Sequence, residues 1–236
     1  MGMLIRYHDD GQALEGYLAV PSSPARRPGV LIVPSWLNVT ATLCRRADRL
    51  ADLGYVAFVA DIFGAGVRPA PPQNPLDVIR PFMSDRLAYR RRLLSGLKVL
   101  KSRAECARNR VAAIGYCFGG CGVLELARSG ARLRGVVSLH GVLTAPLPAE
   151  RGAIKAKILV LHGDADPVVP FAKVLAFRKE MRRTQANWQI SLYGDASHGF
   201  TGEGSVGQWT PEAAMHSQAE HRSWQSMVAF LEEVLE

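Results

Sequence analysis

Short apolar runs alternate along most of the chain with longer segments in which apolar and polar positions follow a helical period. A strand that helices cover on both faces has no polar face, so it reads as a continuous apolar run. Most of the following runs are expected to form such strands: 29–33, 56–60, 111–114, 135–139, 158–161 and 188–193. Apolar residues at spacings of three and four predict helices over 40–53, 85–101, 118–128, 171–183 and a C-terminal stretch from Pro211. The alternation predicts an α/β fold with a mostly parallel central sheet and helices on both of its faces.

The first twenty residues follow a different pattern. Segments 4–8 and 13–20 flank the motif Asp9-Asp10-Gly11, which is a turn signal typical of hairpins. We therefore expect an N-terminal β-hairpin. Residues 68–75 are rich in proline and predict a surface loop near the strand ends.

Length and composition predict one domain. A chain of 236 residues, 48% of them hydrophobic, buries roughly 70 to 75% of the surface that its unfolded form exposes. Residues 1–236 are thus expected to form a single domain that needs neither disulfides nor a metal. The four cysteines, at positions 44, 106, 117 and 121, lack paired zinc-site spacings and are expected to be reduced.

The N-terminus and the apolar runs bear on location. No run approaches the about 20 residues that a membrane-spanning helix needs. The N-terminus has no basic segment followed by a long apolar one. A cytoplasmic location without a membrane partner is expected.

Positive charge is concentrated in one region. The 29 Lys and Arg residues exceed the 21 Asp and Glu residues by eight, which gives a formal net charge of +8. Much of the excess lies on a segment whose Leu93, Leu97 and Leu100 have helical spacing. Its basic residues are Arg86, Arg90, Arg91, Arg92, Lys98, Lys101, Arg103, Arg108 and Arg110. We interpret them as a solvated helix face that attracts anions in general, and we expect no nucleic-acid partner.

The segment that follows the predicted strand 111–114 carries chemistry. It reads Gly115-Tyr116-Cys117-Phe118-Gly119-Gly120 and leads into a predicted helix. A nucleophile between two such glycines sits on a sharp strand-to-helix turn, where larger neighbours would collide with backbone. The N-terminus of the helix points its free N–H groups at the sulfur, favours the thiolate and offers an oxyanion donor. Cys117 is therefore the candidate nucleophile, although a buried structural cysteine would fit the same turn.

An acid and a histidine follow in the chain order of a hydrolase triad. Asp166 comes after the predicted strand 158–161, on a turn before Pro167 that would let it face a histidine. His198 comes after the predicted strand 188–193 and precedes a glycine. We expect Asp166 to be the acid and His198 the general base.

Other residues compete for these two roles. His140 and His162 also follow predicted strands, so each keeps a claim as the base. Asp164 is interpreted as a residue that caps or ties its loop, and Asp195 as part of the structure of the histidine loop.

Over nearly its whole length the chain resembles the dienelactone hydrolase family of the α/β-hydrolase fold. The resemblance is carried by the elbow 115–120, by the turn Gly163-Asp164-Ala165-Asp166-Pro167-Val168-Val169-Pro170 and by the loop Ser197-His198-Gly199-Phe200. The strand and turn at 55–64 are also similar. The resemblance implies a single-domain α/β-hydrolase fold without a large cap domain, and a triad of Cys117, His198 and Asp166.

The chain departs from that family at two positions. Family members place an acidic residue that interacts with the thiol in the loop after the first core strand, where this chain has Ser35. Four residues after the histidine they carry an arginine that grips the substrate carboxylate, where this chain has Gly202. Without that cation, a neutral or aryl ester or lactone fits better than an anionic one.

The expected reaction needs no cofactor and no metal. The Cys117 thiolate attacks an ester carbonyl, and the backbone N–H groups of Phe118 and Trp36 hold the oxyanion. His198 then protonates the leaving group and activates water, while Asp166 fixes its tautomer. Ser35, Trp36 and Leu37 are the candidate substrate-binding residues, and segments 67–82 and 201–209 are expected to shape the pocket. An activated phosphotriester is a possible second substrate, and the protein is expected to be a monomer or a homodimer.

Two other functions stay open. Cys117 and Cys121 lie four residues apart and could serve a thiol-redox or stress protein. The fold could also be a catalytically silent hydrolase fold that acts as a binding module, although silent folds usually lose a member of the triad.

Overall fold

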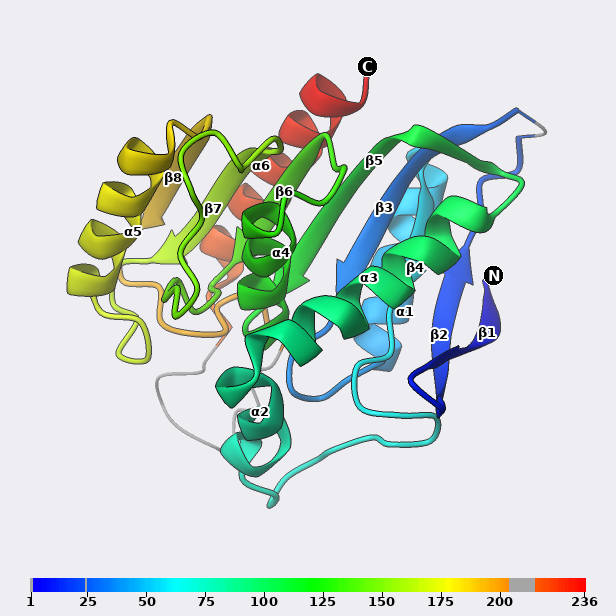
Figure 1. The fold of residues 1–236 in the computed structure, drawn as a ribbon, viewed down its shortest axis with the longest axis horizontal. Coiled ribbons are helices and arrows are strands. Elements are labelled where there is room, and N and C mark those ends of the chain that lie inside the picture. The colour runs from blue at the N-terminus through cyan, green and yellow to red at the C-terminus, as the bar shows by residue number, and fades with distance from the viewer. Residues whose placement is uncertain (1, 24, 204–214) are drawn as a thin grey trace.

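The computed structural model describes residues 2–23, 25–203 and 215–236, and within them the chain builds one eight-stranded sheet flanked by helices (Figure 1). The strands are β1 (Met3–Asp9), β2 (Gln12–Ala19), β3 (Arg27–Val33), β4 (Val56–Val59), β5 (Cys106–Tyr116), β6 (Gly135–Leu139), β7 (Lys157–Gly163) and β8 (Trp188–Tyr193). The helices are α1 (Ala41–Asp52), α2 (Pro75–Ser84), α3 (Arg86–Ser102), α4 (Phe118–Arg128), α5 (Phe171–Thr184) and α6 (Ser217–Leu235).

The strand order is β1-β2-β4-β3-β5-β6-β7-β8. The pairs β1–β2 and β2–β4 are antiparallel, and every pair from β4–β3 to β7–β8 is parallel. Val33 at the end of β3 pairs with Gly115 near the end of β5. The segments after these two strands therefore leave the sheet side by side, at the carboxyl edge where open α/β sheets bind ligands.

The helices form two layers. Figure 1 shows α3, α4 and α5 on one face of the sheet and α1 and α6 on the other. The first layer packs against alternate strand residues such as Leu31 and Ala113, and the second against Val30 and Ile114. This arrangement confirms the predicted α/β fold with a mostly parallel sheet covered on both faces.

The N-terminal hairpin is also confirmed. Asp10 and Gly11 connect β1 to β2 with φ of 51° and 78°. Positive φ at both central residues matches the right-handed twist of the paired strands, and an Asp-Gly pair adopts it readily.

Two elements differ from the prediction. Helix α2 begins at Pro75, with the Asn74 side chain accepting the Leu76 N–H as its N-cap. The prediction stopped at a proline-rich loop and missed this helix, although proline at the first helical position is a start signal. Strand β5 begins at Cys106, five residues earlier than predicted, because Arg27 and Pro28 of β3 pair with Cys106 and Ala107, ahead of the polar residues 108–110. At the C-terminus, the predicted helical residues 211–214 lie outside the described part of the chain, and α6 begins at Ser217.

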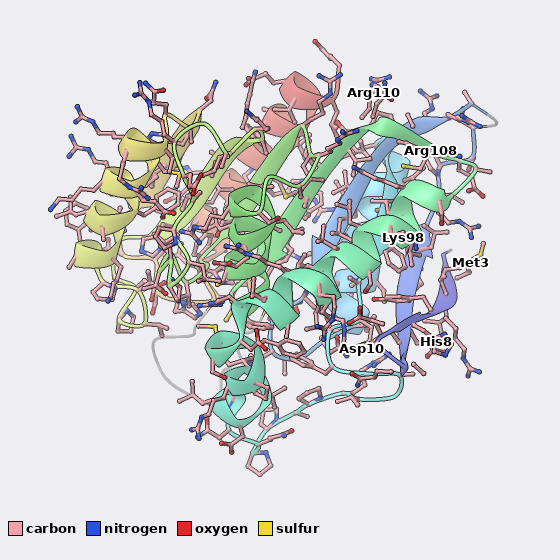
Figure 2. All side chains as sticks on the ribbon, in the orientation of Figure 1. Met3, His8, Asp10, Lys98, Arg108 and Arg110 are labelled. Atoms are coloured by element: carbon pink, nitrogen blue, oxygen red, sulfur yellow. The ribbon has the colours of Figure 1, made fainter. Side chains whose placement is uncertain are left out.

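The interpretation of the basic segment as one solvated face is wrong for Arg86 and Arg92. Both are buried. Arg92 donates to Asp9, Gln12 and the Ile62 carbonyl, so it joins α3 to the N-terminal hairpin. Lys98 is exposed, whereas Arg108 and Arg110 belong to β5 rather than to the helix (Figure 2).

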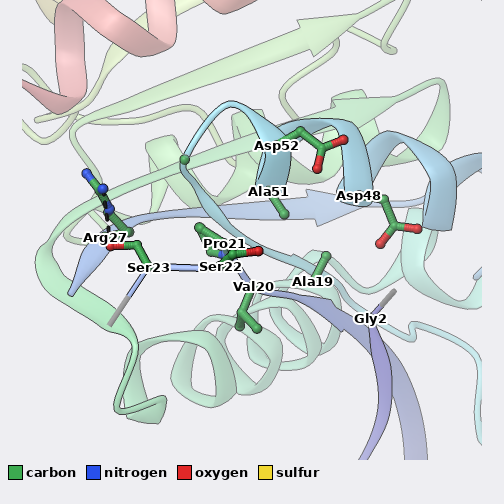
Figure 3. Close-up of a pocket in the computed structure, with 11 residues that line it drawn as sticks. Gly2, Ala19, Val20, Pro21, Ser22, Ser23, Arg27, Asp48, Ala51 and Asp52 are labelled. Atoms are coloured by element: carbon green, nitrogen blue, oxygen red, sulfur yellow. Dashed lines mark hydrogen bonds between the residues drawn. The ribbon is translucent and has the colours of Figure 1, made fainter. Parts of the chain in front are cut away.

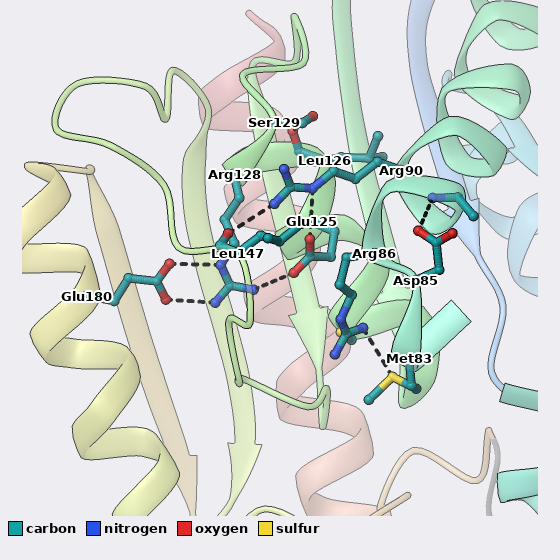
Figure 4. Close-up of polar contacts among 12 residues, drawn as sticks. Met83, Asp85, Arg86, Arg90, Glu125, Leu126, Arg128, Ser129, Leu147 and Glu180 are labelled. Carbon is teal, nitrogen blue, oxygen red and sulfur yellow. Dashed lines mark hydrogen bonds and ion pairs between the residues drawn. The ribbon is translucent and has the colours of Figure 1, made fainter. Parts of the chain in front are cut away.

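Another charged group is buried between α4 and α5. Arg128 pairs with Glu180 at 2.8 Å and with Glu125 at 3.3 Å, and Glu125 also accepts from Arg90 at 2.9 Å (Figure 4). Arg128 also donates to the Leu143 carbonyl, which lies beyond β6. These contacts fix the two helices against the sheet without involving the site described below.

Among the helices that the structure describes, none combines the length and apolar character that crossing a membrane requires.

Candidate active site

Cys117 occupies the turn between β5 and α4. Its backbone has φ 53° and ψ −115°, a conformation that a side chain rarely adopts. A Cβ at Gly115 would lie 2.1 Å from the Gly119 carbonyl oxygen, and one at Gly119 would lie 2.1 Å from the Val33 carbonyl oxygen. Both positions therefore require glycine, as the elbow motif predicts. The surrounding structure holds Cys117 in a strained conformation, as is common for nucleophiles on such turns.

His198 joins Cys117 to Asp166. Its Nε2 atom lies 3.1 Å from Cys117 Sγ, and its Nδ1 atom lies 2.9 Å from Asp166 Oδ2. His198 is 8% exposed and Asp166 4%, while Cys117 is only partly buried. The structure thus brings together the three residues that the sequence singles out, at hydrogen-bond distance and away from bulk water.

The turn after β7 fixes the carboxylate of Asp166. Its Oδ1 atom accepts the backbone N–H groups of Val168 and Val169, each at 2.9 Å. Oδ2 is therefore left to face His198. This division between the two oxygens is what orients the imidazole.

The charges of His198 and Asp166 stabilise each other. Burial alone would lower the pKa of His198, but the Cys117 thiolate and Asp166 raise it to about 10. Burial alone would raise the pKa of Asp166, yet the hydrogen bond to His198 holds it below its ordinary value. A neutral solution therefore favours a protonated His198 beside the ionised carboxylate of Asp166.

The two rival histidines lie near His198 but are engaged elsewhere. His140 is fully buried, with Nε2 2.8 Å from Thr201 Oγ1, and burial lowers its pKa well below the ordinary value. His162 places Nε2 2.9 Å from the Val169 carbonyl, and its Nδ1 is 4.0 Å from Asp166 Oδ2. Both direct Nε2 at these other groups, whereas His198 directs it at Cys117, so the geometry favours His198 as the base.

The loop after β3 runs beside the elbow and is tied down at Asn38. Asn38 has φ 60°, donates to Asp61 Oδ1 at 2.7 Å and accepts the Ile62 N–H at 3.1 Å. Trp36 is buried and Leu37 is half-buried. Direct contact of Ser35, Trp36 or Leu37 with a substrate stays a prediction.

Ser35 is fully buried and contacts a residue that the sequence reasoning missed. Its Oγ atom lies 3.3 Å from Glu203 Oε1 and accepts the Leu37 N–H at 3.3 Å. Glu203 comes five residues after His198 and is 2% exposed. Burial raises its pKa to about 7, although Arg46, Thr40 and Ser35 act in the opposite direction. A lone carboxylate in a glycine-rich loop beside the predicted base was the available signal.

Aromatic side chains gather around Phe118, the residue that follows Cys117. Phe63 and Tyr89 stack on Phe118, with ring centroids 5.9 Å and 4.5 Å away, and Phe82 is tilted against the same ring at 6.3 Å. Phe63 and Phe82 are only half-buried, and both pack on the core cluster that Cys117 joins. Of the two segments expected to shape the pocket, 67–82 includes most of α2, whereas 204–209 lies outside the described residues.

Cys121, one helical turn after Cys117, is a different kind of cysteine. It is fully buried, and its Sγ lies 3.1 Å from Arg86 Nη1, which also contacts Met83 Sδ (Figure 4). Burial raises the pKa of the Cys121 thiol, although Arg86 lowers it. These surroundings are typical of a structural cysteine rather than a reactive one.

A separate polar cavity of about 420 Å³ lies between the end of β2 and the end of α1 (Figure 3). Its lining includes Asp48, Asp52 and Arg27. It does not include Cys117, His198 or Asp166. Within the part of the chain that the structure describes, no three His, Cys, Asp or Glu side chains are grouped so that they could hold a metal ion.

Known proteins share this arrangement of elements. A model of the dienelactone hydrolase family matches residues 14–235. The solved structure named m3DLH is 34% identical with a TM-score of 0.95, covering 100% of this chain and 99% of that one. A dienelactone hydrolase-like promiscuous phosphotriesterase from metagenomic libraries is 33% identical, with a TM-score of 0.93 and the same coverage. A probable 2-oxo-3-(5-oxofuran-2-ylidene)propanoate lactonase of Bradyrhizobium sp. is 26% identical over 208 residues, which are 81% of this chain and 80% of that protein.

Proposed function

Because the chain belongs to the dienelactone hydrolase family, and is therefore a hydrolase of ester bonds, we propose that it cleaves small neutral or aryl carboxylic esters and lactones through a thioester on Cys117. The observation that carries the proposal is the position of His198, which contacts Cys117 Sγ at one ring nitrogen and Asp166 Oδ2 at the other. A nucleophile, a base and an orienting acid in this order form the working set of covalent acyl transfer.

The first half of the reaction forms the thioester. The Cys117 thiolate attacks the carbonyl carbon, and the resulting oxyanion is held by the backbone N–H of Phe118 and of Trp36. Phe118 is the first residue of α4, so its N–H has no partner within the helix. When the tetrahedral intermediate collapses, the bond to the alkoxide breaks and the His198 imidazolium gives that oxygen its proton.

The second half regenerates the enzyme. Neutral His198 takes a proton from a water molecule that attacks the thioester carbonyl. Collapse of the second tetrahedral intermediate releases the acid and returns the thiolate, while His198 is again an imidazolium. Asp166 keeps Nε2 directed at the reacting atoms in both halves.

The surroundings of Cys117 support a neutral substrate. Phe63 and Phe82 offer half-buried aromatic surface on the side of α2, and Gly202 provides no cation for a substrate carboxylate. An aryl group gains from stacking against such rings, whereas an anion would be desolvated without a partner.

Phosphotriester hydrolysis is a second candidate activity. The observation that favours it is the similarity to the promiscuous phosphotriesterase across the whole chain. The same thiolate could attack phosphorus in an activated neutral triester, with the phosphoryl oxygen in the place of the ester oxyanion.

The test is a panel of p-nitrophenyl acyl esters and one aryl phosphotriester, assayed with the wild type and with Cys117→Ala. The proposal expects turnover of neutral esters by the wild type and loss of both activities in the variant. Ester turnover that persists in Cys117→Ala would place the reaction at another site.

The redox alternative is less well supported, because Cys121 is fully buried and contacts Arg86. A catalytically silent fold is disfavoured by the contacts that His198 makes on both sides.

A further inference from the structure

Glu203 is a buried carboxylate that the proposed reaction does not use. It is 2% exposed, and among the described residues its side-chain oxygens meet two hydroxyls. Burying a carboxylate is costly, and the raised pKa of Glu203 records that cost. A buried group kept at such a cost beside candidate catalytic residues is a candidate for a functional role.

One partner of Glu203 is Ser35. Ser35 Oγ donates to Glu203 Oε1 at 3.3 Å and accepts the Leu37 N–H at 3.3 Å. The Ser35 carbonyl accepts the Asn38 N–H at 3.1 Å, which closes a turn around Trp36. A hydroxyl can keep the Leu37 N–H only while its own proton is directed elsewhere, and Glu203 is the acceptor that receives it.

The second partner is Thr40, the N-cap of α1. Thr40 Oγ1 lies 3.3 Å and 3.4 Å from the two oxygens of Glu203 and accepts the Leu43 N–H at 3.1 Å. Residues 35–40, which include Trp36, are called the oxyanion loop below. Glu203 therefore binds this loop at both ends, through Ser35 and through Thr40.

Glu203 is also joined to the segment that carries the base. Its backbone N–H donates to Thr201 Oγ1 at 3.4 Å, and that oxygen lies 2.8 Å from His140 Nε2. The Thr201 carbonyl accepts from Arg46 at 2.8 Å. The 198–203 segment is thereby fixed to the sheet and to α1, so Glu203 reaches the oxyanion loop from an anchored position.

We propose that Glu203 is a positioning residue, whose carboxylate holds the Ser35–Asn38 turn so that the Trp36 N–H meets the developing oxyanion. This inference rests on the proposed function. It assigns to Glu203, in the 198–203 segment, the role of setting the geometry of the oxyanion loop. Glu203 does not touch the reacting atoms and acts through Ser35.

The charged and titratable groups around Glu203 bear on its behaviour with pH. They are Arg45, Arg46 and Cys44 from α1, Tyr116 from β5, His140 after β6, and Glu220 of α6, which pairs with Arg46. Because burial raises the pKa of Glu203 to about 7, it is mostly protonated at pH 6 and mostly ionised at pH 8. The ionised form offers two acceptor oxygens to Ser35 and Thr40, so positioning improves as the pH rises through 7.

The experiment compares acylation rates of Glu203→Gln, Ser35→Ala and the double variant on one neutral p-nitrophenyl ester. Since removal of one oxyanion donor costs about 100-fold to 1000-fold in kcat, a displaced donor should cost about tenfold at pH 8 with little change in KM. The double variant should be no slower than either single variant, because the two residues act through one contact. The rise of kcat near pH 7 should be smaller in Glu203→Gln than in the wild type.

Alkylation of Cys117 by iodoacetamide separates loop positioning from the state of the nucleophile, because alkylation forms no oxyanion. The alkylation rate should stay within about twofold of the wild type in both single variants, because neither substitution touches Cys117. A tenfold loss of acylation would then come from the oxyanion contact alone. Unchanged acylation and an unchanged pH profile in a folded Glu203→Gln would overturn the inference while leaving the Cys117 mechanism intact. If Glu203→Gln fails to fold, Ser35→Ala decides: the same tenfold loss supports the inference, and wild-type acylation overturns it. Loss of the proposed function itself has another signature, which is ester turnover in Cys117→Ala.

Discussion

His198 Nε2 lies 3.1 Å from Cys117 Sγ, although 81 residues separate the two positions in the chain. The sheet produces this contact, because β5 and β8 both end at its carboxyl edge and the segments that follow them turn over that edge. Asp166, which contacts the other side of His198, follows β7, and β7 lies between β5 and β8 in the sheet.

Replacing the nucleophile should abolish turnover. In Cys117→Ala we expect kcat for p-nitrophenyl esters to fall by about 10³-fold or more, because the proposed mechanism forms its covalent bond at this residue. Cys106→Ala is the matched control, since Cys106 is buried at the start of β5, the strand whose far end leads to Cys117. The control should lose some stability to the cavity but keep its kcat. Steady-state kinetics and thermal unfolding of both variants check this.

Asp166→Asn should leave the turn intact and misorient the base. The amide oxygen can still accept the Val168 and Val169 N–H groups, but its NH₂ would then face His198 Nδ1 and favour the wrong tautomer. We expect kcat to drop by about 10²-fold to 10⁴-fold in a variant that still folds. A kcat near that of the wild type would show that the acid is another residue.

The charge of His198 should depend on Cys117. Because the thiolate is the largest influence that raises the pKa of His198, Cys117→Ala should lower that pKa towards its ordinary value. NMR titration of the imidazole in both proteins measures the shift. A histidine with a raised folded pKa stabilises the native state fully below its unfolded value near 6.5, and this contribution is lost as the pH rises through about 10. The wild type should therefore lose more stability than Cys117→Ala between pH 7 and pH 10.

The elbow should not tolerate a methyl group. Gly119→Ala would place Cβ 2.1 Å from the Val33 carbonyl oxygen, a backbone atom that cannot move without shifting β3. We expect a loss of about 3 kcal/mol or more in the free energy of unfolding. Gly194→Ala is the control, because nothing lies within 4 Å of its Cβ position and it should stay within about 0.5 kcal/mol. Denaturant unfolding of the two variants measures both free energies of unfolding and tests this difference.

The sequence predicted the sheet and singled out the three hydrogen-bonded residues of the candidate site because each strand and each residue lies in a local sequence pattern. Apolar runs mark the buried strands, and Cys117, Asp166 and His198 each follow such a run in a turn of distinctive composition. The parallel sheet then gathers the ends of these strands, so local information was enough to assemble the site.

Long-range partners were harder to predict. Arg92 looked like a surface residue because its helix is rich in arginine, yet it is buried by contacts with Asp9 and Gln12 that only the tertiary fold creates. Glu203 was missed for the same reason, since its partner Ser35 lies 168 residues earlier in the chain. Helix α2 was missed because a proline-rich segment hid the Asn74-Pro75 start signal.

The most direct test of the Cys117 mechanism is to trap the covalent intermediate. The enzyme is mixed with excess p-nitrophenyl ester, quenched in acid within the first turnover, and examined by intact mass spectrometry and peptide mapping. The mechanism predicts a burst near one equivalent of p-nitrophenol and one acyl group on the peptide that carries Cys117. Rapid ester turnover with an unmodified Cys117, or with the acyl group on another residue, would contradict it.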